Sequence, residues 1–258
     1  MASMQVDVTG PSKDLHSGFF GGPAVNPIRE LSRALGQLHD ANGRVAVPRF
    51  YDGVPPLPAD IAASWGDLGF DSAAFLGQVG LNTLAGETGK TPLEMIWSEP
   101  TCEINGIWGG YTGAGFKTVI PSQAHAKISC RLVGQQNPFA IRSAVQDFIK
   151  SHLHPDCSVT FQDFGASPAS EMSTDHPVFG AVKSALSDEW PRPAAFIGCG
   201  GSIPIAGHFK TILGMDAVLA GFGKEDDQIH SPNEKYDLRS FTKGTKSWAR
   251  VLAKLAEM

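Results

Sequence analysis

The sequence predicts an α+β fold in which an antiparallel sheet carries helices on one face, followed by a second segment of α/β character. Three observations support this prediction. Residues 123–132 alternate between apolar and polar side chains, as a half-buried strand does. Residues 138–151 then place apolar side chains at helical spacing. After Gly165 the pattern changes to glycine-containing loops and helices, so we expect a domain boundary near this residue.

The first predicted strand covers residues 5–9, and a glycine-rich loop over residues 14–22 follows it. Asn26 and Pro27 then have the residue types favoured at an N-cap and at the first helical position. The helix that they begin is expected to end at Asn42-Gly43. Its apolar stripe consists of Ile28, Leu31, Leu35 and Leu38.

Residues 50–100 are rich in proline and glycine and predict a long insertion with short helices near 58–65, 71–80 and 92–97. The alternating strand and the helix at 138–151 come next, and a further strand is expected at 159–161. The resulting order of strand, helix, strand, helix, strand favours an α+β sandwich built on an antiparallel sheet.

The second segment is predicted to contain a helix near 177–186, a buried strand at 217–220 and a long C-terminal helix. We assign residues 5–165 to the first domain and residues 166–258 to the second. The apolar face expected for the C-terminal helix consists of Phe241, Trp248, Val251, Leu252 and Leu255.

Composition and charge exclude several classes of partner. The formal net charge is −5, so the chain has no basic footprint for nucleic acid or for an anionic membrane. No apolar run approaches the ~20 residues of a membrane span. The N-terminus lacks the basic and apolar regions of a signal peptide, and the four cysteines are far apart. These features predict a cytoplasmic location.

His230 is a candidate metal ligand in a loop between two acids and a Ser-Pro-Asn-Glu turn. A zinc site takes three or four His, Cys, Asp or Glu ligands. The sequence lacks the His-x-Asp, Glu-Glu and His-Glu-x-x-His patterns that usually supply the others. The neighbouring Asp226 and Asp227 are expected to be solvated. The chain is therefore predicted to hold only part of a zinc site.

Arg131 lies on the polar face of the alternating strand together with His125 and Lys127. A guanidinium on a rigid strand suits two-pronged capture of a carboxylate, although an arginine on the wet face of a sheet has the same pattern. His16 lies in a polar loop bounded by glycines, where a histidine is more often solvated than catalytic.

Ser202 follows Gly200-Gly201 and precedes a predicted helix, where exposed backbone amides could bind a carboxylate. A plain glycine-rich connection would have the same sequence. A serine hydrolase that uses Ser202 and His230 is disfavoured, because the Gly-x-Ser-x-Gly elbow is absent.

Five motifs in this order resemble the di-zinc metallopeptidase family of carnosine dipeptidase, aminoacylase and carboxypeptidase G. The resemblance covers essentially the whole chain. Five ordered motifs are far more specific than any one of them. The motifs are Asp14–Gly22, Lys117–Pro121, Lys127–Leu132, Gly200–Pro204 and Ile229–Glu234.

The resemblance implies that residues 5–165 are the lid and dimerisation domain and that residues 166–258 are the C-terminal part of an incomplete catalytic domain, whose N-terminal half is missing. It implies two zinc ions per complete subunit, which this chain is not expected to retain. His230 would be a zinc ligand, and His16 would be catalytic by steadying the oxyanion in the partner subunit's active site. The implied substrate-binding residues are Thr118, Arg131, Gly201 and Ser202.

The chain also departs from the family pattern. Phe164 falls near the position of a further substrate-contacting histidine, and Cys199 replaces a glutamate before Gly-Gly-Ser. The expected parent reaction is hydrolysis of a peptide or N-acyl amide whose substrate has a free carboxylate. We expect a homodimer through the lid and an inactive isolated chain. The alternative is a non-catalytic dimerisation module derived from the same family.

Overall fold

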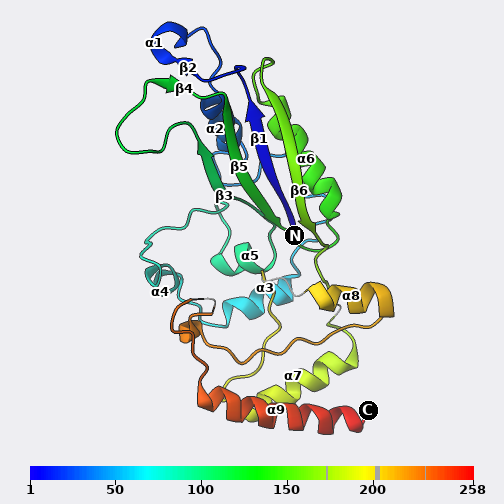
Figure 1. The fold of residues 1–258 in the computed structure, drawn as a ribbon. Coiled ribbons are helices and arrows are strands. Elements are labelled where there is room, and N and C mark those ends of the chain that lie inside the picture. Colours follow the sequence, from blue (N-terminus) through cyan, green and yellow to red (C-terminus); the bar gives the residue numbers. More distant parts are fainter. Residues whose placement is uncertain (173, 201–203, 230) are drawn as a thin grey trace. The chain divides into compact units, whose positions relative to one another are not determined.

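The computed structural model of the protein describes residues 1–172, 174–200, 204–229 and 231–258 (Figure 1). The chain divides into two compact units. Unit 1 comprises Met1–Pro58, Gly69–Glu171 and Gly198–Pro204, and unit 2 comprises Ala59–Leu68, Met172–Ile197 and Ile205–Met258. Among the described residues, no helix is both long and apolar enough to cross a membrane.

Unit 1 is built on a four-stranded antiparallel sheet in the order β3-β5-β1-β6. The predicted strands at 5–9, 123–132 and 159–161 are all present, and the structure adds β3, which the sequence reasoning missed. The strands are β1 (Ala2–Thr9), β3 (Thr101–Gly109), β5 (Gln123–Arg131) and β6 (Ser158–Ala166).

Helices α2 (Pro27–Gly36) and α6 (Pro138–Ser151) pack on this sheet. Asn26 caps α2 by accepting from the Ile28 amide, and Asn137 caps α6 in the same way. Both helices have proline at the start, where its missing N–H costs no hydrogen bond. The predicted α+β architecture with an antiparallel sheet is therefore confirmed. Helix α2 ends at Gly36 rather than at Asn42-Gly43, because the chain turns there so that Leu38 is buried beyond the last helical turn.

The core of unit 1 lies between the sheet and these two helices. The alternation of β5 is followed strictly, since Ala124, Ala126, Ile128 and Cys130 are buried. Strand β1 alternates in the same way, with Met4, Val6 and Val8 buried. From the helices, the core takes Leu31, Ala34, Leu35, Ile141, Val145 and Ile149.

A small extension of unit 1, which we call the arm, consists of residues 14–22 and 110–122. It contains the two-stranded pair β2 (Leu15–His16) and β4 (Val119–Ile120) and the one-turn helix α1 (Ser17–Phe20). In Figure 1 the arm lies beyond the end of the sheet at which β1 ends and β5 begins. At this end the Gly10 amide donates to the Ser122 carbonyl.

The proline- and glycine-rich insertion has the three short helices that its sequence predicts. They are α3 (Ala59–Gly66), which belongs to unit 2, and α4 (Ser72–Gly77) and α5 (Pro92–Trp97), which belong to unit 1. Helix α5 begins with a reciprocal capping box between Thr91 and Glu94.

Unit 2 is centred on two helices that pack against each other, α7 (Pro177–Glu189) and α9 (Leu238–Ala256). Besides α3, it contains α8 (Pro204–Leu213) and the short 3-10 turn η1 (Glu225–Asp227). The Trp190 indole N–H donates to Ser247 Oγ on α9, and the Trp190 ring stacks on the ring of Phe222. Phe222 in turn leaves no room for a side chain at Gly244 of α9.

Two sequence predictions for unit 2 are wrong. Residues 217–220 form no strand, and Leu219 is 55% exposed, because no described strand lies alongside to pair with this segment. The face of α9 that is buried also differs from the predicted one. It consists of Ser240, Gly244, Ser247 and Val251, because small residues let α9 approach α7 and Phe222 closely. The prediction holds for Val251 and for Leu255, which packs against the same cluster, and is wrong for Phe241, Trp248 and Leu252.

Candidate functional site

The arm brings His16 and Thr118 together. His16 pairs with Val119 across the β2–β4 ladder, and the Ser17 amide donates to the Thr118 carbonyl at 2.9 Å. These two residues are far apart in the sequence but adjacent in the structure. Of the three candidate site residues that the structure describes, His16 and Thr118 lie together in the arm.

The position of the His16 ring is set by two contacts within the arm. Its Nδ1 accepts a hydrogen bond from the Gly18 amide at 3.0 Å. The ring also lies against Phe19, with 5.0 Å between the ring centroids. His16 and Phe19 are both exposed in this chain, and Phe19 is 81% exposed. The imidazole is thus held in one orientation on a surface that is open to a partner.

Asp14 joins the two segments of the arm next to the start of β5. Its carboxylate accepts from both the amide and the hydroxyl of Ser122, at 2.8 and 2.9 Å. These two hydrogen bonds, from the Ser122 amide first and from its hydroxyl second, lower the pKa of Asp14 below its usual range. Asp14 was not singled out from the sequence as a structural residue, although an aspartate next to a glycine-rich loop is a frequent fastening point.

Arg131 lies at the opposite end of the same sheet. It is the last residue of β5 and pairs with Thr101 at the start of β3. Strand β5 runs for eight residue steps from Gln123, and an antiparallel strand rises about 3.4 Å per residue, so about 27 Å separates its two ends. His16 and Arg131 of one chain therefore cannot contact the same dipeptide-sized molecule.

The segment 198–200 lies at the Arg131 end of unit 1. A Cβ at Gly198 would come within 2.3 Å of the Trp97 carbonyl oxygen, so this position requires glycine. Gly200 lies against the carbonyl of Ile96. Trp97 ends α5, and Thr101, the partner of Arg131, follows four residues later. Gly198 and Gly200 thus lie at the same end of unit 1 as Arg131.

Three of the candidate residues lie outside the described residues. They are Gly201 and Ser202, proposed to bind substrate, and His230, proposed to bind metal. The flanking residues Gly200, Ile229 and Ser231 are described.

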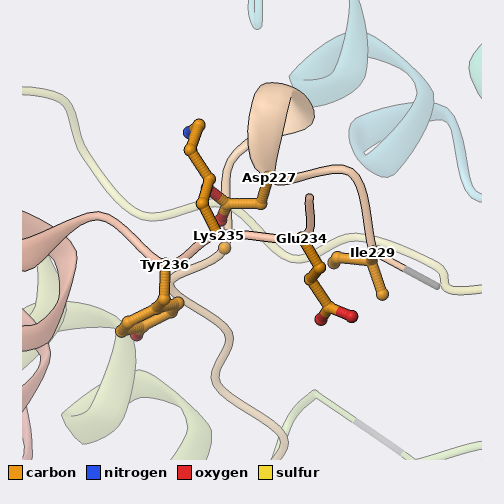
Figure 2. Close-up of a pocket in the computed structure, with 6 residues that line it drawn as sticks. Asp227, Ile229, Glu234, Lys235 and Tyr236 are labelled. Atoms are coloured by element: carbon orange, nitrogen blue, oxygen red, sulfur yellow. The ribbon is translucent and has the colours of Figure 1, made fainter. Parts of the chain in front are cut away.

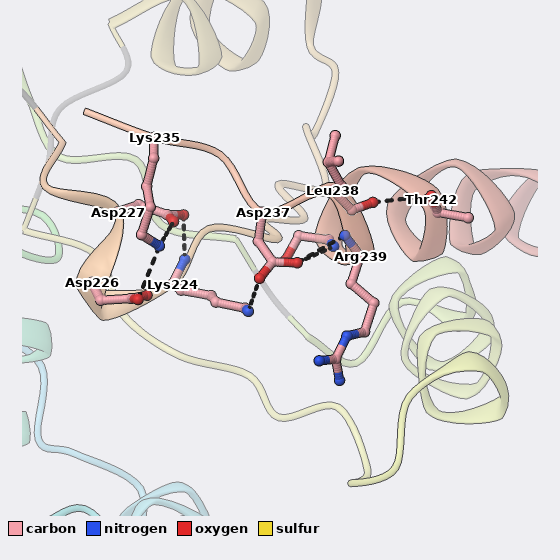
Figure 3. A network of polar contacts seen from close by, with 9 residues as sticks. Lys224, Asp226, Asp227, Lys235, Asp237, Leu238, Arg239 and Thr242 are labelled. Atoms are coloured by element: carbon pink, nitrogen blue, oxygen red, sulfur yellow. Dashed lines mark hydrogen bonds and ion pairs between the residues drawn. The ribbon is translucent and has the colours of Figure 1, made fainter. Parts of the chain in front are cut away.

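The loop on both sides of His230 is held by Asp227, which is 1% exposed (Figure 3). Its carboxylate accepts from the Lys224 amide at 2.7 Å and from the Lys235 ammonium at 3.0 Å. Its carbonyl accepts from the Lys235 amide. Asp226 shares the Lys235 ammonium at 2.9 Å but is exposed. The expectation of solvated acids is therefore confirmed for Asp226 and wrong for Asp227.

Backbone geometry also shapes this loop. Gln228 and Asn233 both have left-handed φ angles, 54° and 64°. The Lys224 amide first and the Lys235 ammonium second lower the pKa of the Asp227 carboxyl below its usual range. Asp227 remains ionised at neutral pH and connects Lys224, before the loop, to Lys235, after it.

A pocket of about 470 Å³ opens beside this loop. It is lined by Gly223, Asp227, Ile229, Glu234, Lys235 and Tyr236. In Figure 2 the Glu234 carboxylate and the Lys235 ammonium point in opposite directions. The lining mixes two acids, a base and apolar surface, so the pocket has no single charge preference.

The residues that the structure describes do not build a metal site by themselves. No three His, Cys, Asp or Glu side chains in residues 1–172, 174–200, 204–229 and 231–258 lie close enough to hold an ion. Asp226 and Asp227, the two acids that precede His230, are paired with Lys235. A zinc site that uses His230 would need ligands from outside these residues.

Comparison with known proteins places these features in a family. A profile of the M20 peptidase dimerisation domain matches residues 1–157. The Cys-Gly metallodipeptidase DUG1 of Candida albicans is 32% identical over 94% of this chain and 51% of its own length. The human Beta-Ala-His dipeptidase is 30% identical over 98% of this chain and 50% of its own.

Solved structures give the same result. The dipeptidase Dug1p from Saccharomyces cerevisiae aligns with a TM-score of 0.81 at 29% identity, over all of this chain and 54% of its own. Human carnosine dipeptidase 1 aligns with a TM-score of 0.79 at 28% identity, over all of this chain and 55% of its own. The chain spans about half the length of the curated relatives that it matches.

Proposed function

The chain belongs to the M20 metallopeptidase family, and on this premise we propose that it provides the lid and the C-terminal part of the catalytic domain of a zinc-dependent dipeptidase. The lid would comprise residues 5–165 and the catalytic part residues 166–258. The reaction would be hydrolysis of a peptide or N-acyl amide bond in a substrate with a free carboxylate. The observation that most directly supports this proposal is the match of the whole chain to dipeptidase structures at a TM-score near 0.8.

Within this proposal the residues have separate roles. Arg131, Gly201 and Ser202 bind the substrate carboxylate or the adjacent carbonyl, because a guanidinium and exposed amides are suited to an anionic group. His16 and Thr118 act in the active site of the partner subunit. This assignment is supported by the separation of about 27 Å along β5, which keeps the arm away from Arg131 of the same chain.

His230 would provide one zinc ligand, with two zinc ions in each complete subunit. A bound metal would polarise the scissile carbonyl and activate water. The described residues supply no further ligand cluster. The isolated 258-residue chain is therefore proposed to be inactive and to act within a larger cytoplasmic enzyme.

We further propose that the homodimer forms through the β3 edge of the lid sheet. Among the strands of the described residues, β3 pairs with β5 alone, and the side chains of Ile104 and Ile107 on it are 42% and 52% exposed. A free strand edge with apolar side chains favours pairing with a second chain. Two copies of β3 could pair antiparallel about a two-fold axis.

The other edge of the sheet, β6, is less suited to this role. Arg142 of α6 donates to the Phe164 carbonyl and pairs with Asp163 at 3.1 Å. Gln146 also donates to the Asp163 carboxylate. Side chains from α6 thus cover part of this edge, which disfavours strand addition.

Analytical ultracentrifugation tests the dimer. We expect the purified chain to sediment at twice its monomer mass, and Ile107→Glu to shift it to monomer. Gln162→Glu on β6 is the matched control and should leave the dimer intact. A monomeric wild-type chain, or a dimer that only the β6 variant breaks, would contradict this part of the proposal.

Hydrolysis assays separate the two candidate functions. We expect no cleavage of Cys-Gly or carnosine by the chain alone with zinc added, and cleavage when the same residues replace their counterparts in a full-length relative. Chelator-sensitive cleavage by the chain alone would refute the proposed inactivity. A chain that dimerises but gives an inactive chimera would favour the alternative, a non-catalytic dimerisation module.

A further inference from the structure

The arm contains a hydrogen bond whose direction fixes the chemistry of His16. The donor is a backbone amide, that of Gly18, and the acceptor is His16 Nδ1 at 3.0 Å. An amide nitrogen can only donate here, so Nδ1 must present a lone pair. In a neutral imidazole the proton then resides on Nε2, because one ring nitrogen carries it and the other accepts.

The local sequence makes this arrangement depend on glycine. A Cβ at position 18 would lie 2.9 Å from His16 Cε1 and 3.1 Å from His16 Nδ1. A side chain at this position would therefore have to displace the His16 ring from its present place. Phe19 lies against the ring as well, and this contact restricts its rotation.

A second histidine in unit 1 shows the opposite arrangement. The His152 Nδ1 lies 2.7 Å from the Phe148 carbonyl oxygen, which can only accept. Neutral His152 therefore carries its proton on Nδ1. The chain contains two histidines whose surroundings select opposite tautomers, and His152 is a built-in reference for His16.

We propose that Gly18 is a positioning residue that fixes neutral His16 as the Nε2–H tautomer, so that His16 presents a hydrogen-bond donor rather than a base to the partner subunit's substrate. The inference rests on the proposed function for the site that the donor faces. An N–H donor stabilises an oxygen on which negative charge develops. The opposite tautomer would present a lone pair to that oxygen and repel it.

Long-range ¹H–¹⁵N correlation spectra of the chain labelled with ¹⁵N-histidine test the tautomer directly. Spectra are recorded in mildly alkaline buffer, where imidazoles are neutral. We expect His16 to show an unprotonated Nδ1 and a protonated Nε2, and His152 to show the reverse. His16→Gln and His152→Gln assign the two rings. A protonated Nδ1 at His16, or averaged signals from both nitrogens, would overturn the inference.

Glycine variants test the role of Gly18. In Gly18→Ala the His16 signals should shift toward the average of two exchanging tautomers, while those of His152 stay in place. Gly36→Ala is the matched control, since a Cβ there meets nothing within 4 Å. Unchanged His16 signals in Gly18→Ala would show that Gly18 does not fix the ring. The spectra need neither zinc nor hydrolysis, so their result is independent of the dimer and activity tests.

Discussion

The two units of this chain have very different cores. In unit 1, 19 buried apolar residues form one continuous cluster between the sheet and its helices. The cluster formed by α7 and α9 in unit 2 has three buried members among the described residues, Val182, Ala185 and Val251. Unit 1 can therefore be stabilised by its own side chains, whereas unit 2 buries little apolar surface of its own.

Helix α9 shows where the apolar residues of unit 2 are instead. Its buried face has Ser240, Gly244 and Ser247, while Leu238 and Leu252 are 83% and 65% exposed. Phe241 and Trp248 are exposed on the same helix. An apolar stripe of this kind on the outside is unusual for a self-sufficient domain and indicates a surface that packs against further polypeptide. Substitutions of apolar residues should therefore mainly change stability in unit 1 and mainly change surface association in unit 2.

The largest expected effect comes from the core of unit 1. Ile128→Ala should destabilise the sheet by about 2–5 kcal/mol, because Ile128 is fully buried between β5 and the helices. Hydrogen exchange measured by mass spectrometry should show faster exchange in β1 and β5 and unchanged exchange in α9. Equal acceleration in α9 would mean that the two units unfold together. Val251→Ala in unit 2 is the converse variant, which should speed exchange in α9 and leave exchange in β1 and β5 unchanged.

A local effect is expected at the loop that carries His230. Asp227→Asn removes the charge paired with Lys235 and should speed exchange of the amides of residues 228–234 several-fold. Asp226→Asn is the control, because Asp226 shares Lys235 but is exposed. If both variants behaved alike, burial of Asp227 would not be what holds the loop.

A smaller stability effect is expected on the outer face of α9. Leu238→Ser and Leu252→Ser should change the free energy of unfolding by no more than about 0.5 kcal/mol, because these side chains are mostly exposed. They should lower the binding of a hydrophobic fluorescent dye and reduce self-association. Val251→Ser, on the buried face of the same helix, should lower the free energy of unfolding by more than this and should not reduce dye binding or self-association. A large loss of stability in Leu252→Ser would show that the stripe is already packed.

The smallest effect concerns pH. Asp237 caps α9, and the Lys224 ammonium first and the Arg239 amide second lower its pKa to about 2. An unfolded aspartate titrates near ~3.9, so the depressed pKa stabilises the folded unit above about pH 4. This contribution is lost as the pH falls toward 2.

Thermal melts followed by circular dichroism at a series of pH values measure this contribution. Asp237→Asn keeps a good N-cap but has no charge. We expect the difference in stability between wild type and variant to shrink between pH 4 and 2. A constant difference across that range would show that the charge of Asp237 plays no part.

Much of unit 1 could be predicted from local sequence signals. Strand β5 alternates throughout, and Asn137-Pro138 defines the start of α6. Strand β3 was missed because a bulge between Ile104 and Gly106 breaks its alternation, and its glycines weaken the strand pattern. The pairing of β2 with β4 joins distant segments of two residues each, which have no periodicity to detect.

Unit 2 was harder to predict for a physical reason. Residues 217–220 have the composition of a buried strand, but a strand forms only when a neighbour pairs with it. The face of α9 was assigned by its large apolar residues, whereas close packing against α7 selects small ones. The resemblance predicted roles for His16 and Thr118, but only the structure shows that the two residues lie together in the arm. The burial of Asp227 had no sequence signal that distinguishes it from Asp226.

The separation of the arm from Arg131 has a genetic consequence. Under the proposed dimer, each active site takes His16 from one chain and Arg131 from the other. Co-expression of full-length enzymes that carry His16→Ala and Arg131→Ala would give mixed dimers with one intact site and one doubly defective site. Two alleles that are each inactive alone would then complement each other, and about half of the wild-type activity would return in every mixed dimer.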